Sequence, residues 1–200
     1  MPQVRQQYYI NPFLQDIDNV LATSRTKYRL KANCTAVNTT MWHCLNNVEK
    51  EATVLIDGHG AQAGFNEPVN GISNGLSGEQ RIYCSPAQIA TWLHQYWTLP
   101  TSHVKIRLLG CELNHVAQQL AIELGHLGYA NIVVGGYIDS VIYDGFDAQT
   151  GRGSAYSLVD LGTHNQLFSK SDLDGEERLE WFNAQGQKVT KPFFEKCISV

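Results

Sequence analysis

The sequence predicts an α/β fold: a mostly parallel sheet with helices on both faces and an antiparallel β-hairpin at the C-terminal end. Short apolar runs occur at 53–56, 105–109 and 132–134, and such runs are typical of buried strands. Helical patterns separate them, over 86–97 and 111–127, and strands that alternate with helices form parallel sheets. The 200 residues suffice for one domain with a substantial core.

The N-terminal region predicts two helices and a strand. Asn11-Pro12 offers an N-cap and a favoured first helical residue, and apolar residues then recur at helical spacing as far as Leu21. Residues 25–31 alternate with period two and indicate a strand. A second, short helix capped by Thr39 or Thr40 would carry one apolar face, made of Met41, Trp42, Leu45 and Val48.

Residues 60–80 are rich in Gly, Asn and Ser and predict a long loop. Ser85-Pro86 then opens a helix with the apolar stripe Ile89, Trp92, Leu93, Tyr96 and Trp97.

Leu113, Val116, Leu120, Leu124 and Leu127 are expected to face inward from the next helix, which ends near Gly125 or Gly128. The strand after it stops at Gly135-Gly136. Residues 155–159 indicate a further strand, and the terminal hairpin pairs 179–182 with 187–190.

Composition excludes several classes of function. The net charge of −4 argues against nucleic acid or an anionic membrane surface as the main partner. No apolar run reaches the ~18 residues of a membrane span, and the N-terminus lacks the apolar core of a Sec signal. We therefore expect a protein that is cytoplasmic as synthesised.

Five cysteines, an odd number without a CxxC pair, fit a reduced intracellular protein. A zinc site built from Cys34, His43, Cys44 and Cys84 is the alternative, but these spacings match no structural zinc pattern. Buried cysteines that act as small hydrophobic residues are the better interpretation, and we expect no metal.

Two of the predicted strands end on reactive side chains. The strand at 53–56 leads into Asp57-Gly58-His59-Gly60, and the strand at 105–109 leads into Gly110-Cys111. In open α/β sheets, ligands bind at the carboxyl ends of the strands. A thiol to attack and an imidazole to manage its proton are the two parts of a cysteine nucleophile. The pair predicts catalysis by Cys111 and His59.

The local sequence suggests how the thiol would be activated. If Cys111 opens the following helix, the helix N-terminus favours its thiolate. Its own backbone N–H and that of Gly60 would form an oxyanion hole. Taken singly, a buried cysteine is usually a packing residue and a histidine between glycines is usually a surface residue. His115, one helical turn beyond Cys111, is the less favoured rival base, and no acidic partner for the histidine is assigned.

These motifs resemble the caspase-like cysteine peptidases, the group of caspases, gingipains and clostripain. The likeness is greatest to the autoprocessing cysteine protease domains of large bacterial toxins. It rests on the order of Leu55 to Gly60, Leu76-Ser77-Gly78, Ile106 to Cys111, and Val133 to Tyr137. The resemblance implies a caspase-like three-layer sandwich. It also implies that Gly135, Gly136 and Tyr137 border the substrate pocket. The caspase signature Gln-Ala-Cys-x-Gly is absent.

The toxin domains use inositol hexakisphosphate as an activator, and this acidic chain has no obvious equivalent of their basic site. We expect no required cofactor. The candidate anion site is the row of cations that a strand would place on one face, Arg25, Lys27, Arg29 and Lys31. A solvated edge strand, whose charges block edge-to-edge pairing, is the favoured alternative.

The sequence thus predicts a cysteine endopeptidase whose partner is a protein or peptide substrate. Because the chain begins at Met1 and the fold fills it, we expect cleavage of a separate protein instead of self-processing. The resemblance suggests a bacterial effector that acts in the cytosol of a host cell. Two alternatives stay open: another thiol acyl-transfer enzyme, such as a deamidase or transglutaminase-like enzyme, and a non-catalytic interaction module with the same fold.

Overall fold

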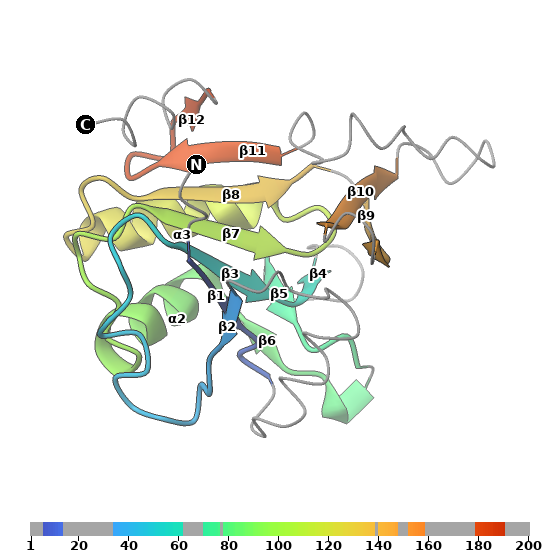
Figure 1. The fold of residues 1–200 in the computed structure, drawn as a ribbon, viewed down its shortest axis with the longest axis horizontal. Coiled ribbons are helices and arrows are strands. Elements are labelled where there is room, and N and C mark those ends of the chain that lie inside the picture. The colour runs from blue at the N-terminus through green and yellow to red at the C-terminus, as the bar shows by residue number, and fades with distance from the viewer. Residues whose placement is uncertain are drawn as a thin grey trace.

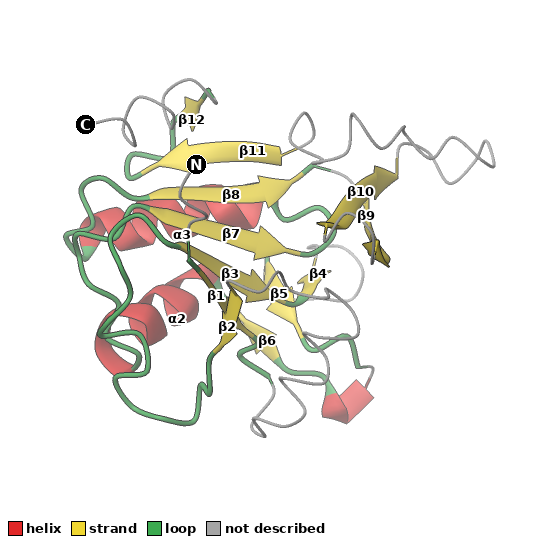
Figure 2. Cartoon of the chain, viewed as in Figure 1, coloured by secondary structure: helices red, strands yellow, loops and turns green. Residues whose placement is uncertain are grey.

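The computed structural model describes residues 6–13, 34–61, 70–76, 78–138, 140–147, 152–158 and 179–190. Their centre is a seven-stranded sheet (Figures 1 and 2). Its order is β12 (Lys188–Val189), β11 (Leu179–Asn183), β8 (Val133–Tyr137), β7 (Lys105–Leu109), β3 (Thr53–Asp57), β1 (Gln7–Ile10) and β2 (Cys34–Ala36). The strands from β8 to β2 run parallel, and β11 and β12 form the antiparallel end. The predicted mostly parallel sheet and the C-terminal hairpin are confirmed.

The crossovers between the central strands are helical. The connection from β3 to β7 contains α2 (Pro86–Thr91), which continues into a π-helical turn, η3 (Trp92–Tyr96). A capping box fixes its start, since the Ser85 side chain accepts from the Gln88 N–H and the Gln88 side chain accepts from the Ser85 N–H. The connection from β7 to β8 is α3 (Asn114–His126), followed by Gly128 at φ 94°.

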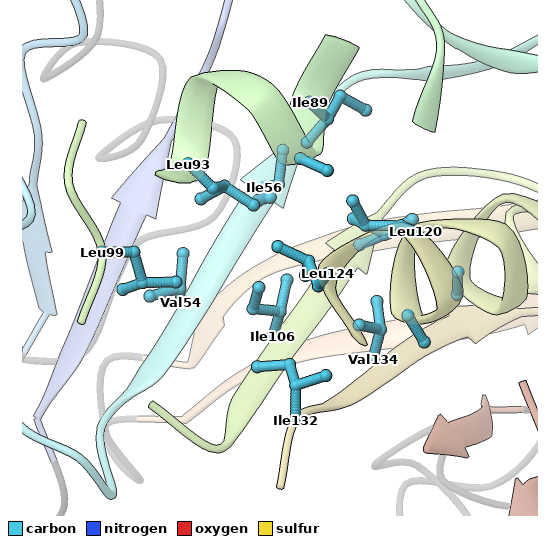
Figure 3. Close-up of a cluster of buried hydrophobic side chains, with 14 of the residues drawn as sticks. Val54, Ile56, Ile89, Leu93, Leu99, Ile106, Leu120, Leu124, Ile132 and Val134 are labelled. Carbon is cyan, nitrogen blue, oxygen red and sulfur yellow. The ribbon is translucent and has the colours of Figure 1, made fainter. Parts of the chain in front are cut away.

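Both described helices pack on one face of the sheet and enclose the main core. Figure 3 shows Leu120 and Leu124 of α3 and Ile89 of α2 directed toward side chains of the sheet. The strand residues in this layer are alternate positions of neighbouring strands, and they are fully buried: Val54, Ile56, Ile106 and Val134. The helix predicted from Asn11 to Leu21 lies almost wholly outside the described residues.

The opposite face carries aromatic and cationic side chains. Register aligns Tyr9, Leu55, Arg107, Gly135 and Trp181 across five strands. The Arg107 guanidinium donates to the Tyr137 hydroxyl, and the Lys105 ammonium lies 5.2 Å above the Trp181 ring. Cation–π contacts of this kind let basic side chains lie against a partly buried surface.

Three predictions about local structure are wrong. Residues 39–47 form turns instead of a helix, and Met41 and Trp42 are exposed while Leu45 and Val48 are buried. The expected loop at 60–80 contains β4 (His59–Ala61), β5 (Gly71–Ser73) and the 3-10 turn η2 (Gly78–Gln80). The strand expected to stop at Gly135-Gly136 continues through both glycines to Tyr137.

Two small sheets lie near the carboxyl ends of the central strands (Figure 1). One joins β4, β5 and β6 (Tyr83–Cys84). The other is the hairpin of β9 (Ser140–Asp147) and β10 (Arg152–Leu158), and the strand expected at 155–159 corresponds to β10. No helix in the described part of the chain is long and apolar enough to cross a membrane.

A fully buried histidine joins the amino ends of β3 and β7. His103 Nε2 lies 2.8 Å from the Lys105 carbonyl oxygen, and Nδ1 lies 3.3 Å from that of Glu49. Burial lowers the pKa of His103, and the two carbonyl contacts oppose that shift. The neutral form is therefore favoured in the folded protein relative to the unfolded chain.

We expect acid to weaken this fold below neutral pH. A histidine pKa lowered by folding means that the unfolded chain binds more protons, so stability is fully present above about pH 6.5 and falls as the pH drops below it. Thermal unfolding measured between pH 5 and 8 checks this, with His103→Gln as the comparison. The His103→Gln variant should show a shallower dependence of the unfolding temperature on pH. A residual slope should remain, because burial also lowers the pKa of His115. Identical slopes would contradict this role for His103.

Candidate active site

His59 follows the carboxyl end of β3 and is the first residue of β4. Gly58 separates it from the buried strand, and β4 pairs antiparallel with β5, where His59 is opposite Ser73. The imidazole is exposed to solvent. The structure therefore places it on a short paired strand instead of the free glycine-rich loop that the sequence predicted.

A glycine makes room for the imidazole ring of His59. Gly75 has φ 74°, and a Cβ atom at this position would lie 2.6 Å from His59 Nε2 and would overlap Cδ2. The turn that carries Gly75 is held by Asn74, whose side chain accepts from the Leu76 and Ile82 N–H groups. Any side chain at position 75 would displace the ring, so Gly75 helps to position His59.

Cys111 lies in the turn between β7 and α3. The helix begins at Asn114, so the expectation that Cys111 opens the helix is wrong. Glu112, at φ 54°, separates Cys111 from the N-cap Leu113. A left-handed residue other than glycine is uncommon and strained. Cys111 is therefore followed by a sharp strained turn, and it does not lie in the first turn of a helix.

The two strand ends are in direct contact. β3 and β7 are parallel neighbours with Asp57 opposite Leu109, and the Gly58 N–H donates to the Leu109 carbonyl at 3.2 Å. A Cβ atom on Gly60 would overlap the Cys111 carbonyl oxygen. The segment with the imidazole and the segment with the thiol therefore touch through their backbones, at a distance that only glycine allows.

The Cys111 thiol packs against residues from the next strands. The side chain is half-buried and contacts the small apolar cluster of Tyr137 and Leu179, which Trp181 also joins. The structure thus brings Cys111 together with Tyr137, one of the residues predicted to border the substrate pocket.

The two glycines predicted to border that pocket are buried within β8. Trp181 covers Gly135, since a Cβ atom there would lie 2.7 Å from the indole ring. Gly136 faces the start of α3, where a Cβ atom would lie 2.6 Å from the Leu113 carbonyl carbon. Both glycines allow close packing at these positions, and their contact with substrate stays a prediction.

The carboxylate nearest in sequence to His59 is bound elsewhere. Asp57 is buried and accepts hydrogen bonds from the Tyr9 hydroxyl at 2.5 Å and from the Asn11 amide at 3.2 Å. These bonds tie the end of β1 to the end of β3. Asp57 therefore stabilises the strand end from which His59 departs.

The other candidates from the sequence have different positions. His115 lies on the first turn of α3, and burial lowers its pKa, although the Glu112 carboxylate opposes that shift. Arg25, Lys27, Arg29 and Lys31 lie outside the described residues. Within the described ranges, no three His, Cys, Asp or Glu side chains are grouped so that they could hold a metal ion.

Two other cysteines have the character of packing residues. Burial raises the pKa of Cys84 to about 12 and that of Cys44 to about 11. Their thiols stay protonated at neutral pH, which makes them poor nucleophiles and poor metal ligands. Cys84 is fully buried, which confirms its interpretation as a small buried hydrophobic residue. Cys44 is half-buried.

Sequence reasoning missed Gly75 and Arg107. Asn74-Gly75 is a turn signal, but its closeness to His59 depends on the pairing of β4 with β5. The signal for Arg107 is the alternation of Lys105 and Arg107 with apolar residues in β7, which is typical of a strand with one polar face.

No protein-family model matches the chain, and no curated protein matches it in sequence.

Proposed function

We propose that this chain is a cysteine endopeptidase with Cys111 as nucleophile and His59 as general base and acid. One observation carries the proposal: the thiol and the imidazole follow the carboxyl ends of two adjacent parallel strands whose backbones touch at Gly60 and Cys111. Ligands bind at this edge of open α/β sheets. The resemblance to caspase-like peptidases supports the same pair, and with it a three-layer arrangement of the fold.

The proposed reaction uses these two side chains in sequence. His59 takes the proton of the Cys111 thiol, and the sulfur attacks the carbonyl carbon of a peptide bond. The N–H groups of Gly60 and Cys111 stabilise the tetrahedral oxyanion. His59 then gives the proton to the leaving amine, which departs and leaves a thioester. Water, deprotonated by His59, attacks the thioester and releases the acid, and the thiol regains its proton.

The substrate is proposed to be a separate protein. The half-buried indole of Trp181, which packs with Cys111 against the buried pair Tyr137 and Leu179, is the apolar side chain proposed to contact a side chain of the peptide. Action in the cytosol of a host cell is proposed on the resemblance to toxin domains alone. No cofactor is needed for the steps above.

A search for new protein N-termini tests the proposal. Purified wild-type protein and the Cys111→Ala variant are each added to a cell lysate, and new N-termini are quantified by mass spectrometry. Termini that appear only with the wild type support a peptidase. New glutamate at former glutamine positions, or new amine adducts, without new termini would instead identify a deamidase or a transglutaminase-like enzyme. An unchanged proteome would favour a non-catalytic module.

The dyad also predicts the order in which the thiols react. Iodoacetamide at neutral pH should modify Cys111 ahead of Cys44 and Cys84, because burial raises the pKa of both. His59→Ala should slow alkylation of Cys111, since the imidazole no longer accepts its proton. Peptide mapping by mass spectrometry measures each rate, with and without a substrate-like peptide, because an apo site can hold a dyad too far apart. Equal rates for all three thiols under both conditions would contradict the dyad.

A further inference from the structure

A pocket of about 270 Å³ is lined by residues other than His59 and Cys111. Its apolar walls come from Pro12, Met41, Trp42, Trp92, Tyr96 and Trp97, and Thr39 and Thr40 complete the lining. No charged side chain of the described residues contributes to it. His59 and Cys111 are not among the lining residues, although Pro12 follows the carboxyl end of β1 and is next to Asn11, which bonds Asp57. The pocket is therefore formed by residues other than the proposed dyad.

A π-helical turn brings two of the indole rings together. The Trp97 N–H donates to the Trp92 carbonyl at 2.8 Å, a bond to the fifth residue back. In an ordinary α-helix, residues five apart point roughly 140° away from each other. Here the rings of Trp92 and Trp97 lie 5.7 Å apart, inclined at 52°. π-turns within helices occur frequently at functional sites.

The opposite wall of the pocket carries an exposed aromatic side chain, that of Trp42. Trp42 is 66% exposed, and its ring meets the ring of Tyr96 edge to face at 5.1 Å. The next residue, His43, has φ 60°, and its N–H donates to the Tyr96 carbonyl at 2.7 Å. The Trp97 indole N–H also donates to the Thr39 carbonyl at 3.1 Å. Strained backbone fixed by such bonds holds Trp42 at the surface instead of letting it collapse into the core.

Most of the strongly exposed apolar side chains are gathered here. Met41 is 61% exposed and Tyr96 is 39% exposed, beside Trp42. The two other large exposed apolar residues of the described chain, Leu76 and Ile82, belong to the turn near His59. A cluster of exposed apolar rings around a hollow indicates a surface that binds a partner.

The polar atoms of the pocket define the partner's chemistry. The indole N–H of Trp97 is bonded within the fold, to the Thr39 carbonyl, whereas those of Trp42 and Trp92 and the Tyr96 hydroxyl make no bond to another described residue and can donate to solvent or to a ligand. A ligand without charge that presents flat apolar faces and acceptors therefore complements this lining. A quaternary ammonium group supplies no acceptor. A sugar needs acceptors on the protein for its own hydroxyls, and the Thr40 hydroxyl already donates to Asn38 Oδ1 at 2.7 Å.

We propose that this aromatic pocket binds a proline-rich segment of a protein partner in the polyproline II conformation. Proline rings are uncharged and pack well against aromatic faces, and the extended backbone leaves its carbonyl oxygens free to accept from indole and phenol donors. Few N–H groups of such a segment need acceptors, which matches a lining that has mostly donors. The proposed recruitment uses neither His59 nor Cys111 and does not depend on the thiol chemistry.

Binding of a polyproline peptide tests this proposal directly. An acetylated peptide of about ten prolines is titrated into the Cys111→Ala variant, and tryptophan fluorescence and calorimetry follow the binding. The catalytically disabled background keeps the result independent of peptidase activity. A Gly-Ser peptide of equal length is the ligand control, and tetramethylammonium chloride tests the competing aromatic-cage chemistry.

We expect saturable binding of the polyproline peptide, weakened about tenfold or more by Trp42→Ala and likewise by Tyr96→Ala. Both side chains are exposed, so circular dichroism and thermal unfolding should match the parent protein. Ile82→Ala removes an equally exposed apolar residue near His59 and should leave the affinity unchanged. Absence of saturation, equal binding of the Gly-Ser peptide, saturation by tetramethylammonium instead, or retained affinity in both aromatic variants would overturn the proposal.

Discussion

Replacement of Cys111 by alanine should reduce peptide cleavage by about 10⁴-fold or more. The methyl group that remains cannot attack a carbonyl carbon, and removal of the nucleophile alone costs nearly as much as removal of the whole catalytic set. Stability should hardly change. Cys111 is half-buried at the edge of the Tyr137 and Leu179 cluster, so the loss of its sulfur atom should lower the unfolding temperature by less than about 3 °C.

The measurement is the initial rate of cleavage of a peptide that contains the site found in the N-terminus search. Cys44→Ala is the matched control, because Cys44 is also half-buried and its raised pKa keeps it protonated. This control should retain the wild-type rate. If Cys111→Ala cleaves within about threefold of the wild type, Cys111 is not the nucleophile, and the proposed mechanism is wrong.

The central strands could be predicted because buried parallel strands have continuous apolar runs. The runs at 53–56 and 105–109 correspond closely to β3 and β7. The predicted helix at 39–48 fails for a physical reason. Its apolar spacing suits a helix, but His43 adopts φ 60° and the N–H of His43 bonds the carbonyl of Tyr96, far along the chain. Tertiary contacts of this kind override local spacing.

The site shows the same division between local and non-local information. That His59 and Cys111 follow strand ends could be read from short motifs. That their strands are neighbours depends on the sheet order, and that Gly60 touches Cys111 depends on the path of β4, which leaves the central sheet after β3 and pairs with β5. The start of α3 was misplaced because Glu112 is not a residue type that signals a left-handed turn. The packing roles of Gly135 and Gly136 depend on Trp181 and on α3, which are remote in sequence.

Gly136→Ala should destabilise the protein by about 3 kcal/mol, whereas Gly135→Ala should cost about 1 kcal/mol or less. A new methyl group on Gly136 would overlap the Leu113 carbonyl oxygen and lie 2.9 Å from the Ala117 Cβ, so the rigid start of α3 would have to move. On Gly135 its three nearest neighbours would all be atoms of the half-buried indole ring of Trp181, a side chain that can shift more readily than the backbone at the start of α3. Replacement of a strand glycine by alanine also restricts the unfolded chain, which favours folding. This gain offsets a larger share of the cost in Gly135→Ala, where the clash is smaller, than in Gly136→Ala.

Thermal unfolding of the two variants at one pH distinguishes the two faces of β8. For a chain of this size, about 3 kcal/mol corresponds to a decrease of about 6–12 °C for Gly136→Ala. Equal decreases for both variants would show that the backbone of α3 is not the obstacle.

A displacement of α3 in Gly136→Ala would also affect catalysis, because Leu113 is the N-cap of α3 and lies two residues beyond Cys111. A shift of α3 that relieves the clash should move the turn that presents the thiol. Gly136→Ala should therefore lose cleavage activity at temperatures where it is still fully folded, and Gly135→Ala should keep it.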